Sequence, residues 1–95
     1  MSLLHDPMHP GEVLKELYLD PLDIGAIGLA RRLGVPRTRI ERLVKGATSM
    51  TPDTALRLAR VFNTTPEYWM NMQTNFDMHA AIQQLDVSEI EPLVA

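Results

Sequence analysis

Positive charge is concentrated in one short stretch, LARRLGVPRTRIERLVKG, at residues 29–46, which holds six of the chain's nine lysines and arginines. Residues 31–60 contain eight bases and two acids, whereas residues 61–95 contain five acids and no base. Arginine can donate paired hydrogen bonds to guanine O6 and N7, and both cations pair with phosphates. Because a polyanion responds to local potential rather than to the net charge of −3, this segment indicates a nucleic-acid partner. The alternative is a solvated helix face.

The spacing of small and branched residues in the same stretch predicts a helix-turn-helix. Ala30 is followed by Gly34 four residues later and by Ile40 six residues after that. A small side chain lets two helices cross closely, a glycine permits the tight turn, and Val35 and Ile40 set the angle between the helices. An ordinary helical hairpin is the alternative, and the joint occurrence of all three landmarks disfavours it.

The second helix of this unit has one basic face. At about 100° per residue, apolar residues such as Ile40 fall on one side, and Thr38 and Arg42 fall on the opposite side. The first turn of such a helix comes closest to base edges in the major groove, whereas groups near its end suit phosphate contacts. The predicted base-reading residues are Arg37, Thr38 and Arg42, with Arg39 contacting either a base or a phosphate; the predicted phosphate contacts are Lys45, Thr48 and Ser49.

Hydrophobic periodicity and capping residues predict an all-α chain of five helices, with the helix-turn-helix at helices two and three. The first helix is expected from His9-Pro10 to Asp20-Pro21, the second to end at Gly34, the third to run from Pro36 to Gly46, the fourth to begin at Thr51-Pro52, and the fifth to run from Pro66 into the low eighties. The residues expected to face inward are Val13, Leu14, Leu17, Tyr18, Ile27, Ala30, Leu33, Ala55, Leu56, Ala59, Phe62, Trp69, Met72, Phe76 and Ala80. Residues 1–8 form an N-terminal extension, residues 9–85 the helix-turn-helix domain with a dimerising fifth helix, and residues 86–95 an acidic C-terminal tail.

Composition argues against several other functions. The chain has no cysteine, which excludes disulfides and thiolate sites and suits the cytoplasm. His5 and His9 have a metal-like spacing, but Pro7 and Pro10 disfavour the helix that such a pair needs. No catalytic Ser-His-Asp set, enclosed carboxylate pair or phosphate-binding loop is legible, so we expect no enzyme activity, metal or cofactor. No apolar run approaches the roughly 20 residues of a membrane span.

Three segments carry a resemblance to a known family: HPGEVLKELYLDPL, LARRLGVPRTRIERLVKG and TPDTALRLARVFNTTPEYWMNMQ. Together they resemble the Cro/repressor-type helix-turn-helix proteins, and among them the HigA-type antitoxins of bacterial toxin-antitoxin pairs. The resemblance implies a five-helix lambda-repressor-like fold, a homodimer on a palindromic operator in double-stranded DNA, and repression of its own operon. It also implies neutralisation of a cognate HigB-type toxin, a ribosome-dependent mRNA endonuclease. Arg37, Thr38 and Arg42 match the family's base-contacting positions, and Lys45 a phosphate-contacting one.

The chain departs from the family's pattern at the start of helix two. Gly25-Ala26 stands where many relatives have Ser-Gln, in which the glutamine grips a phosphate. Backbone N–H groups remain available there, but Asp23 adds repulsion, so DNA contacts from this end are not predicted.

The fifth helix carries more large apolar residues than one helix can bury against its own domain. Part of this excess is assigned to a dimer interface of Trp69, Met70, Phe76 and Met78, and the alternative is that these residues, like Met72, are core. The first ten residues are a candidate contact arm for a basic toxin. Some of Arg31, Arg32, Arg57 and Arg60 are expected to pair with acids of the first helix.

Two other functions remain open on the sequence alone. A stand-alone phage-type repressor would bind DNA without a toxin partner. A helical protein-interaction module would not touch DNA, and its binding would lack the steep salt dependence of phosphate contacts.

Overall fold

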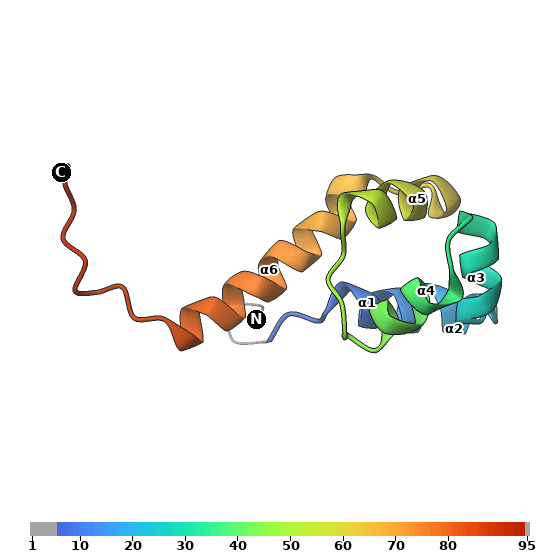
Figure 1. Ribbon diagram of the computed structural model, residues 1–95, viewed down its shortest axis with the longest axis horizontal. Helices are drawn as coiled ribbons and strands as arrows, with labels where there is room; N and C mark the ends of the chain where they lie inside the picture. The colour runs from blue at the N-terminus through green and yellow to red at the C-terminus, as the bar shows by residue number, and fades with distance from the viewer. Residues whose placement is uncertain (1–5, 95) are drawn as a thin grey trace.

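A computed structural model describes residues 6–94, and every regular element in that range is helical. Three consecutive segments, α1 (Pro10–Val13), the π-helical η2 (Leu14–Leu19) and α2 (Asp20–Leu22), form one uninterrupted first helix. They are followed by α3 (Ala26–Leu33), α4 (Arg37–Val44), α5 (Pro52–Phe62) and α6 (Pro66–Gln84). The result is five helical bodies, which confirms the predicted all-α fold. Figure 1 shows α6 running from its packing against α5 away from the other helices toward the C-terminus, and the molecule measures 51 × 25 × 23 Å.

The first helix does not stop at Asp20-Pro21, so that prediction is wrong. In η2 the N–H of Asp20 donates to the carbonyl of Lys15, five residues back. A proline within an α-helix clashes with the carbonyl four residues earlier, and the wider π turn directly before Pro21 relieves that contact. The helix continues to Leu22 and ends at Asp23, whose φ is 54°.

The wide turn also shifts the buried face by one residue. Leu14 and Leu19 are both buried, whereas Leu17 is 61% exposed. Residues five apart lie nearly above one another where hydrogen bonds span five residues, so Leu19 takes the inward position that regular α-helical spacing assigned to Leu17. The predicted burial of Leu17 is therefore wrong.

The α3–α4 turn has the geometry that its residues predict. Gly34 adopts a φ of 72°, in the left-handed region that glycine enters without strain, and the N–H of Val35 donates to the carbonyl of Ala30 at 3.1 Å. Ala30, Ile40 and Leu43 are buried between the two helices. The inward prediction fails for Ile27, which is 49% exposed, because Leu29 and Leu33 occupy the core side of α3.

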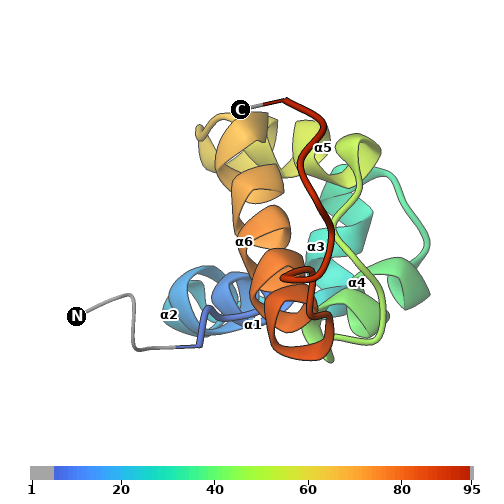
Figure 2. The ribbon, with the colours of Figure 1, turned by 90° about the vertical axis from the view of Figure 1, so that its left-hand side faces the viewer.

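Helices α5 and α6 begin with the same N-terminal capping arrangement. Thr51 and Thr65 each accept a hydrogen bond from the backbone N–H three residues later, and a proline follows each of them in the first turn. Leu58 is fully buried in α5, whereas Leu56, predicted to face inward, is 60% exposed. Figure 2 shows α6 between the first helix and α5, and it contacts both.

Trp69 is the largest fully buried side chain of the core. Its ring lies against those of Tyr18 and Tyr68, with centroids 5.2 and 5.0 Å away, and its Nε1 donates to Thr64 Oγ1 at 2.8 Å. Burial, and then the neighbouring Tyr68 hydroxyl at 3.0 Å, raises the pKa of Tyr18 to about 12. Assigning Trp69 to a dimer interface is therefore wrong, because other residues of the same chain cover it completely.

Candidate nucleic-acid interface

Helix α4 presents polar and basic side chains on the face opposite its buried one. Ile40 and Leu43 are buried, whereas Arg37, Thr38 and Arg42 are exposed. Within residues 6–94, neither Arg37 nor Arg42 forms an ion pair. Their guanidinium groups therefore have donors available for an external acceptor, as reading of a base edge requires.

An open cavity of about 440 Å³ adjoins this face and gathers most of the predicted site. It lies between α4, the loop that follows α4, and the first turn of α5. Its polar lining residues are Thr38, Arg39, Arg42, Thr48, Ser49, Thr51, Asp53 and Thr54. The predicted base-reading and phosphate-contacting groups thus meet on one surface, except that Arg37 and Lys45 lie outside the cavity and are exposed at the two ends of α4.

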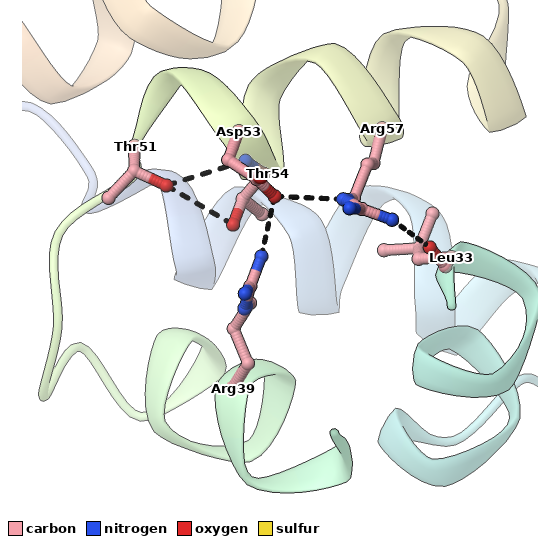
Figure 3. Close-up of polar contacts among 6 residues, drawn as sticks. All are labelled: Leu33, Arg39, Thr51, Asp53, Thr54 and Arg57. Atoms are coloured by element: carbon pink, nitrogen blue, oxygen red, sulfur yellow. Dashed lines mark hydrogen bonds and ion pairs between the residues drawn. The ribbon is translucent and has the colours of Figure 1, made fainter. Parts of the chain in front are cut away.

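Arg39 is held by an acid of another helix. Its Nη1 donates to Asp53 Oδ1 at 2.6 Å, and Arg57 Nε donates to the same oxygen at 2.8 Å (Figure 3). Arg57 Nη1 also donates to the carbonyl of Leu33 at the end of α3, at 2.7 Å. Hydrogen bonds from Arg57 and then Arg39 lower the pKa of the Asp53 carboxyl below its ordinary value.

The remaining basic residues do not pair as predicted. Arg57 pairs with Asp53 of its own helix rather than with an acid of the first helix. Arg31, Arg32 and Arg60 have no carboxylate partner in the described part of the chain, where Lys15 pairs with Asp20 inside the first helix. The prediction of ion pairs to the first helix is wrong because those acids already have a nearer lysine or face solvent.

The start of the first helix packs directly against the last turn of α4 and positions it. A methyl group on Gly11 would stand 1.7 Å from the carbonyl oxygen of Leu43, so only glycine fits this approach. The N–H of Gly11 donates to His9 Nδ1 at 2.9 Å, and the His9 ring packs edge-on against Phe76 of α6 at 5.0 Å. His9 is therefore a buried helix cap that ties the start of the first helix to α6.

Gln73 fixes the loop between α4 and α5 from the other side. Its buried Oε1 accepts a hydrogen bond from the backbone N–H of Met50 at 2.6 Å, and its Nε2 donates to Asp77 at 2.9 Å. This loop carries Thr48 and Ser49. Gln73 ends the third of the segments that carry the family resemblance. The sequence alone gives no partner for it, because the contact joins residues 23 positions apart.

The N-terminal predictions are changed by the burial of His9 and Pro10. Residues 9 and 10 belong to the core and cannot form a free contact arm. Asp6 Oδ1 lies 2.9 Å from His79 Nε2 on α6, while His5 lies outside the described residues. In the range 6–94 no group of three or more potential ligands is placed to hold a metal ion.

Met70, Phe76 and Met78, the other residues predicted for a dimer interface, differ in exposure. Met78 is 53% exposed, Met70 and Phe76 are half-buried, and Phe76 contacts His9. Ile82 of α6 and Leu85, the residue that follows the helix, are also exposed. Among the residues predicted for a dimer interface, the apolar surface that remains exposed therefore lies on the second half of α6, beyond the turn that carries Trp69.

No helix in the described range has both the length and the apolar character of a membrane span.

A helix-turn-helix family model matches residues 27–69. The chain is 45% identical over 76 residues to virulence-associated protein I of Dichelobacter nodosus, covering 80% of this chain and 70% of that protein. It is 36% identical to antitoxin HigA-1 of Vibrio cholerae over 72 residues, 76% of this chain and 68% of that one.

A solved structure of the Pseudomonas aeruginosa antitoxin HigA with the higBA promoter superposes with a TM-score of 0.82 at 36% identity, covering 93% of this chain and 99% of that one. The match includes the first helix and α6 as well as the helix-turn-helix unit, because it extends over nearly the full length of both chains. The chain therefore belongs to the Cro/repressor-type helix-turn-helix family, in the group of the HigA-type antitoxins.

Proposed function

We propose that this chain is a sequence-specific DNA-binding repressor of its own operon and the antitoxin of a type II toxin-antitoxin pair. The observation that carries the DNA-binding part is the exposed face of α4, where Arg37 and Arg42 have no carboxylate partner among residues 6–94, on a helix held in place by its close contact with Gly11. A major-groove helix needs this combination of free donors and a rigid support. The promoter complex of the related Pseudomonas aeruginosa antitoxin supports the same mode.

In this proposal Arg37, Thr38 and Arg42 read bases, and Lys45, Thr48 and Ser49 contact phosphates. The cavity that joins Thr38, Arg42, Thr48 and Ser49 supports a shared DNA surface. One helix gives limited specificity, so the repressor acts as a homodimer on a palindromic operator with half-sites about 34 Å apart. The exposed apolar residues on the second half of α6, Met78 among them, are the proposed dimer surface.

Substitution of Arg42 separates base reading from phosphate contact. Arg42→Ala is expected to cost about 1 to 3 kcal/mol on a duplex selected by the wild-type protein from a random pool, and much less on random DNA, because a lost bidentate contact removes discrimination. Lys45→Ala is expected to weaken both duplexes alike and to reduce the salt slope by about 1. Fluorescence anisotropy over a salt series measures both effects. Equal losses on both duplexes for Arg42→Ala would overturn its assignment.

The antitoxin part of the proposal concerns a basic toxin of the HigB type. Its support is the kinship with HigA proteins and the acidic character of residues 61–95, which contain five acids and no base. Opposite charge speeds association with a basic partner. A phage-type repressor with no toxin is the alternative, and a neighbouring gene for a small basic protein separates the two.

Co-expression with that neighbouring protein tests toxin binding and the N-terminal arm together. The full chain is expected to co-purify with the neighbouring protein. A variant that begins at Met8 is expected to retain less of that protein, because it lacks the segment that contacts His79. This variant keeps the buried His9, so its fold should be preserved. Arg42→Ala serves as the control and should co-purify like the wild type, since its site lies on α4. Unchanged capture by the truncated variant would exclude the arm as a contact, and no capture by the full chain would favour the stand-alone repressor.

A further inference from the structure

The acidic residue at the start of α5 faces the same cavity as the proposed DNA-contacting residues. A carboxylate on a surface meant for a polyanion opposes binding, so its presence there needs a reason. We propose that Asp53 is a positioning residue that holds Arg39 back from DNA phosphates, and thereby limits binding to DNA of any sequence while leaving base reading by Arg37 and Arg42 intact. This inference rests on the proposed DNA-binding function.

Two arginines, one on α4 and one on α5, bond to Asp53. One oxygen of its carboxylate accepts hydrogen bonds from Arg39 Nη1 at 2.6 Å and from Arg57 Nε at 2.8 Å. Charge-assisted bonds of this kind are stronger than neutral ones. The bond fixes the position of the Arg39 guanidinium and the carboxylate offsets its charge, so a phosphate attracts Arg39 less than it would attract a free arginine.

Arg57 makes the position of Asp53 rigid. Its Nη1 is bonded to the carbonyl of Leu33 at 2.7 Å, so its guanidinium spans from the end of α3 to the first turn of α5 (Figure 3). Asp53 also stands one residue after Pro52, in the first turn of α5, where the helix dipole favours a negative charge. The carboxylate is thus placed before any DNA arrives.

The pair is nevertheless open to solvent, since the Arg39 and Asp53 side chains are 40% and 55% exposed. Exposed ion pairs add little to folding stability. Removing the pair should therefore change DNA binding more than it changes the fold. The consequence for recognition is weaker binding to DNA of every sequence than three free arginines on α4 would give, because a phosphate contact by Arg39 would raise the affinities for selected and for random DNA alike.

Asp53→Asn tests this restraint by removing the charge with little change in shape. We expect several-fold tighter binding to random duplex, a salt slope steeper by about 0.9 for one additional phosphate contact, and a similar gain on the selected duplex. Arg39→Gln alone should change random binding little, whereas in the Asp53→Asn background it should abolish the gain. Glu41→Gln on α4 is the charge-matched control; Glu41 forms no ion pair in the described residues, so its effect should not depend on Arg39.

Two outcomes would overturn the inference. The first is a gain from Asp53→Asn that persists when Arg39 is glutamine, since the effect would then be one of general charge. The second is a loss from Arg39→Gln alone, on random duplex, as large as that from Lys45→Gln, because Arg39 would then contact a phosphate even with Asp53 in place. This comparison does not require an Asp53 variant to fold. Thermal unfolding of each variant checks that the fold is retained.

A heparin column distinguishes failure of this inference from failure of the proposed function, because heparin is a polyanion without bases. If the wild type shows no preference for any selected duplex, the proposed repressor function fails, yet an Arg39-dependent delay of Asp53→Asn on heparin still supports the restraint. If the wild type binds a selected duplex specifically but the variant elutes from heparin unchanged, only the inference fails.

Discussion

Replacing Gly11 with alanine is expected to lower the free energy of unfolding by about 3 kcal/mol or more, at or beyond the upper end for overpacking a close contact. The added methyl group would stand 1.7 Å from the carbonyl oxygen of Leu43 and 2.6 Å from its carbonyl carbon. Both atoms are backbone, so no side chain can rotate to make room. The first helix would have to separate from α4. Urea denaturation followed by circular dichroism measures the loss.

Gly28→Ala is the matched control for this substitution. Gly28 lies within α3, and a methyl group there would meet only Ile24 Cγ2 at 3.6 Å, an ordinary contact. Alanine is favoured over glycine inside a helix by roughly 0.5 to 1 kcal/mol. The control should therefore be neutral or slightly stabilising. A Gly11→Ala protein as stable as the Gly28→Ala protein would show that the two helices are not held at this distance.

Trp69→Ala is expected to lower the free energy of unfolding by about 3 to 5 kcal/mol, a large part of the total for a domain of this size. The indole is fully buried between Tyr18 and Tyr68, and its Nε1 bond to Thr64 would also be lost. Circular dichroism in urea is the suitable measurement, because the substitution removes the only tryptophan of the chain.

Trp69→Phe separates the contribution of packing from that of the hydrogen bond. It keeps an aromatic ring and should recover more than half of the loss, leaving Thr64 without its donor. Sedimentation velocity provides the contrary test. If Trp69→Ala converted a dimer to a monomer with little change in stability, Trp69 would be an interface residue after all.

Local signals predict most of the fold of this chain. Thr51 and Thr65 cap their helices through bonds to residues three positions later, and Gly34 makes its turn with its own backbone. Each of these features is decided within a few residues, so their positions can be inferred from sequence. The exposed side of α4 is likewise set by helical spacing once Ile40 and Leu43 are assigned to the core.

The errors arise where one element decides the conformation of another. Leu17 and Ile27 are apolar residues at helical spacing, yet they are exposed, because the π turn rotates one helix and Leu29 already fills the core side of the other. No sequence rule for an α-helix anticipates the π turn, since Pro21 by itself indicates a helix end.

Only part of the candidate site could be predicted from the sequence, for the same reason. The residues of α4 are readable from spacing, whereas the bond between Arg39 and Asp53 joins residues 14 positions apart, and that between Gln73 and Met50 joins residues 23 apart. The sequence predicts that Arg39 contacts DNA, but it does not predict that Arg39 is bonded to Asp53. That bond depends on how α4 and α5 lie against each other, which the spacing of residues within one helix does not reveal.

The π turn in the first helix has a consequence for how related chains of different length should be compared. A helix that closes one turn with five-residue bonds contains one residue more than an α-helix joining the same two ends. A chain shorter by one residue between Leu14 and Leu19 could form a regular α-helix there and still place both flanking leucines inward. Gaps in an alignment of such chains therefore belong inside this helix, and shifting them into the neighbouring loop would pair residues that do not occupy the same place in space.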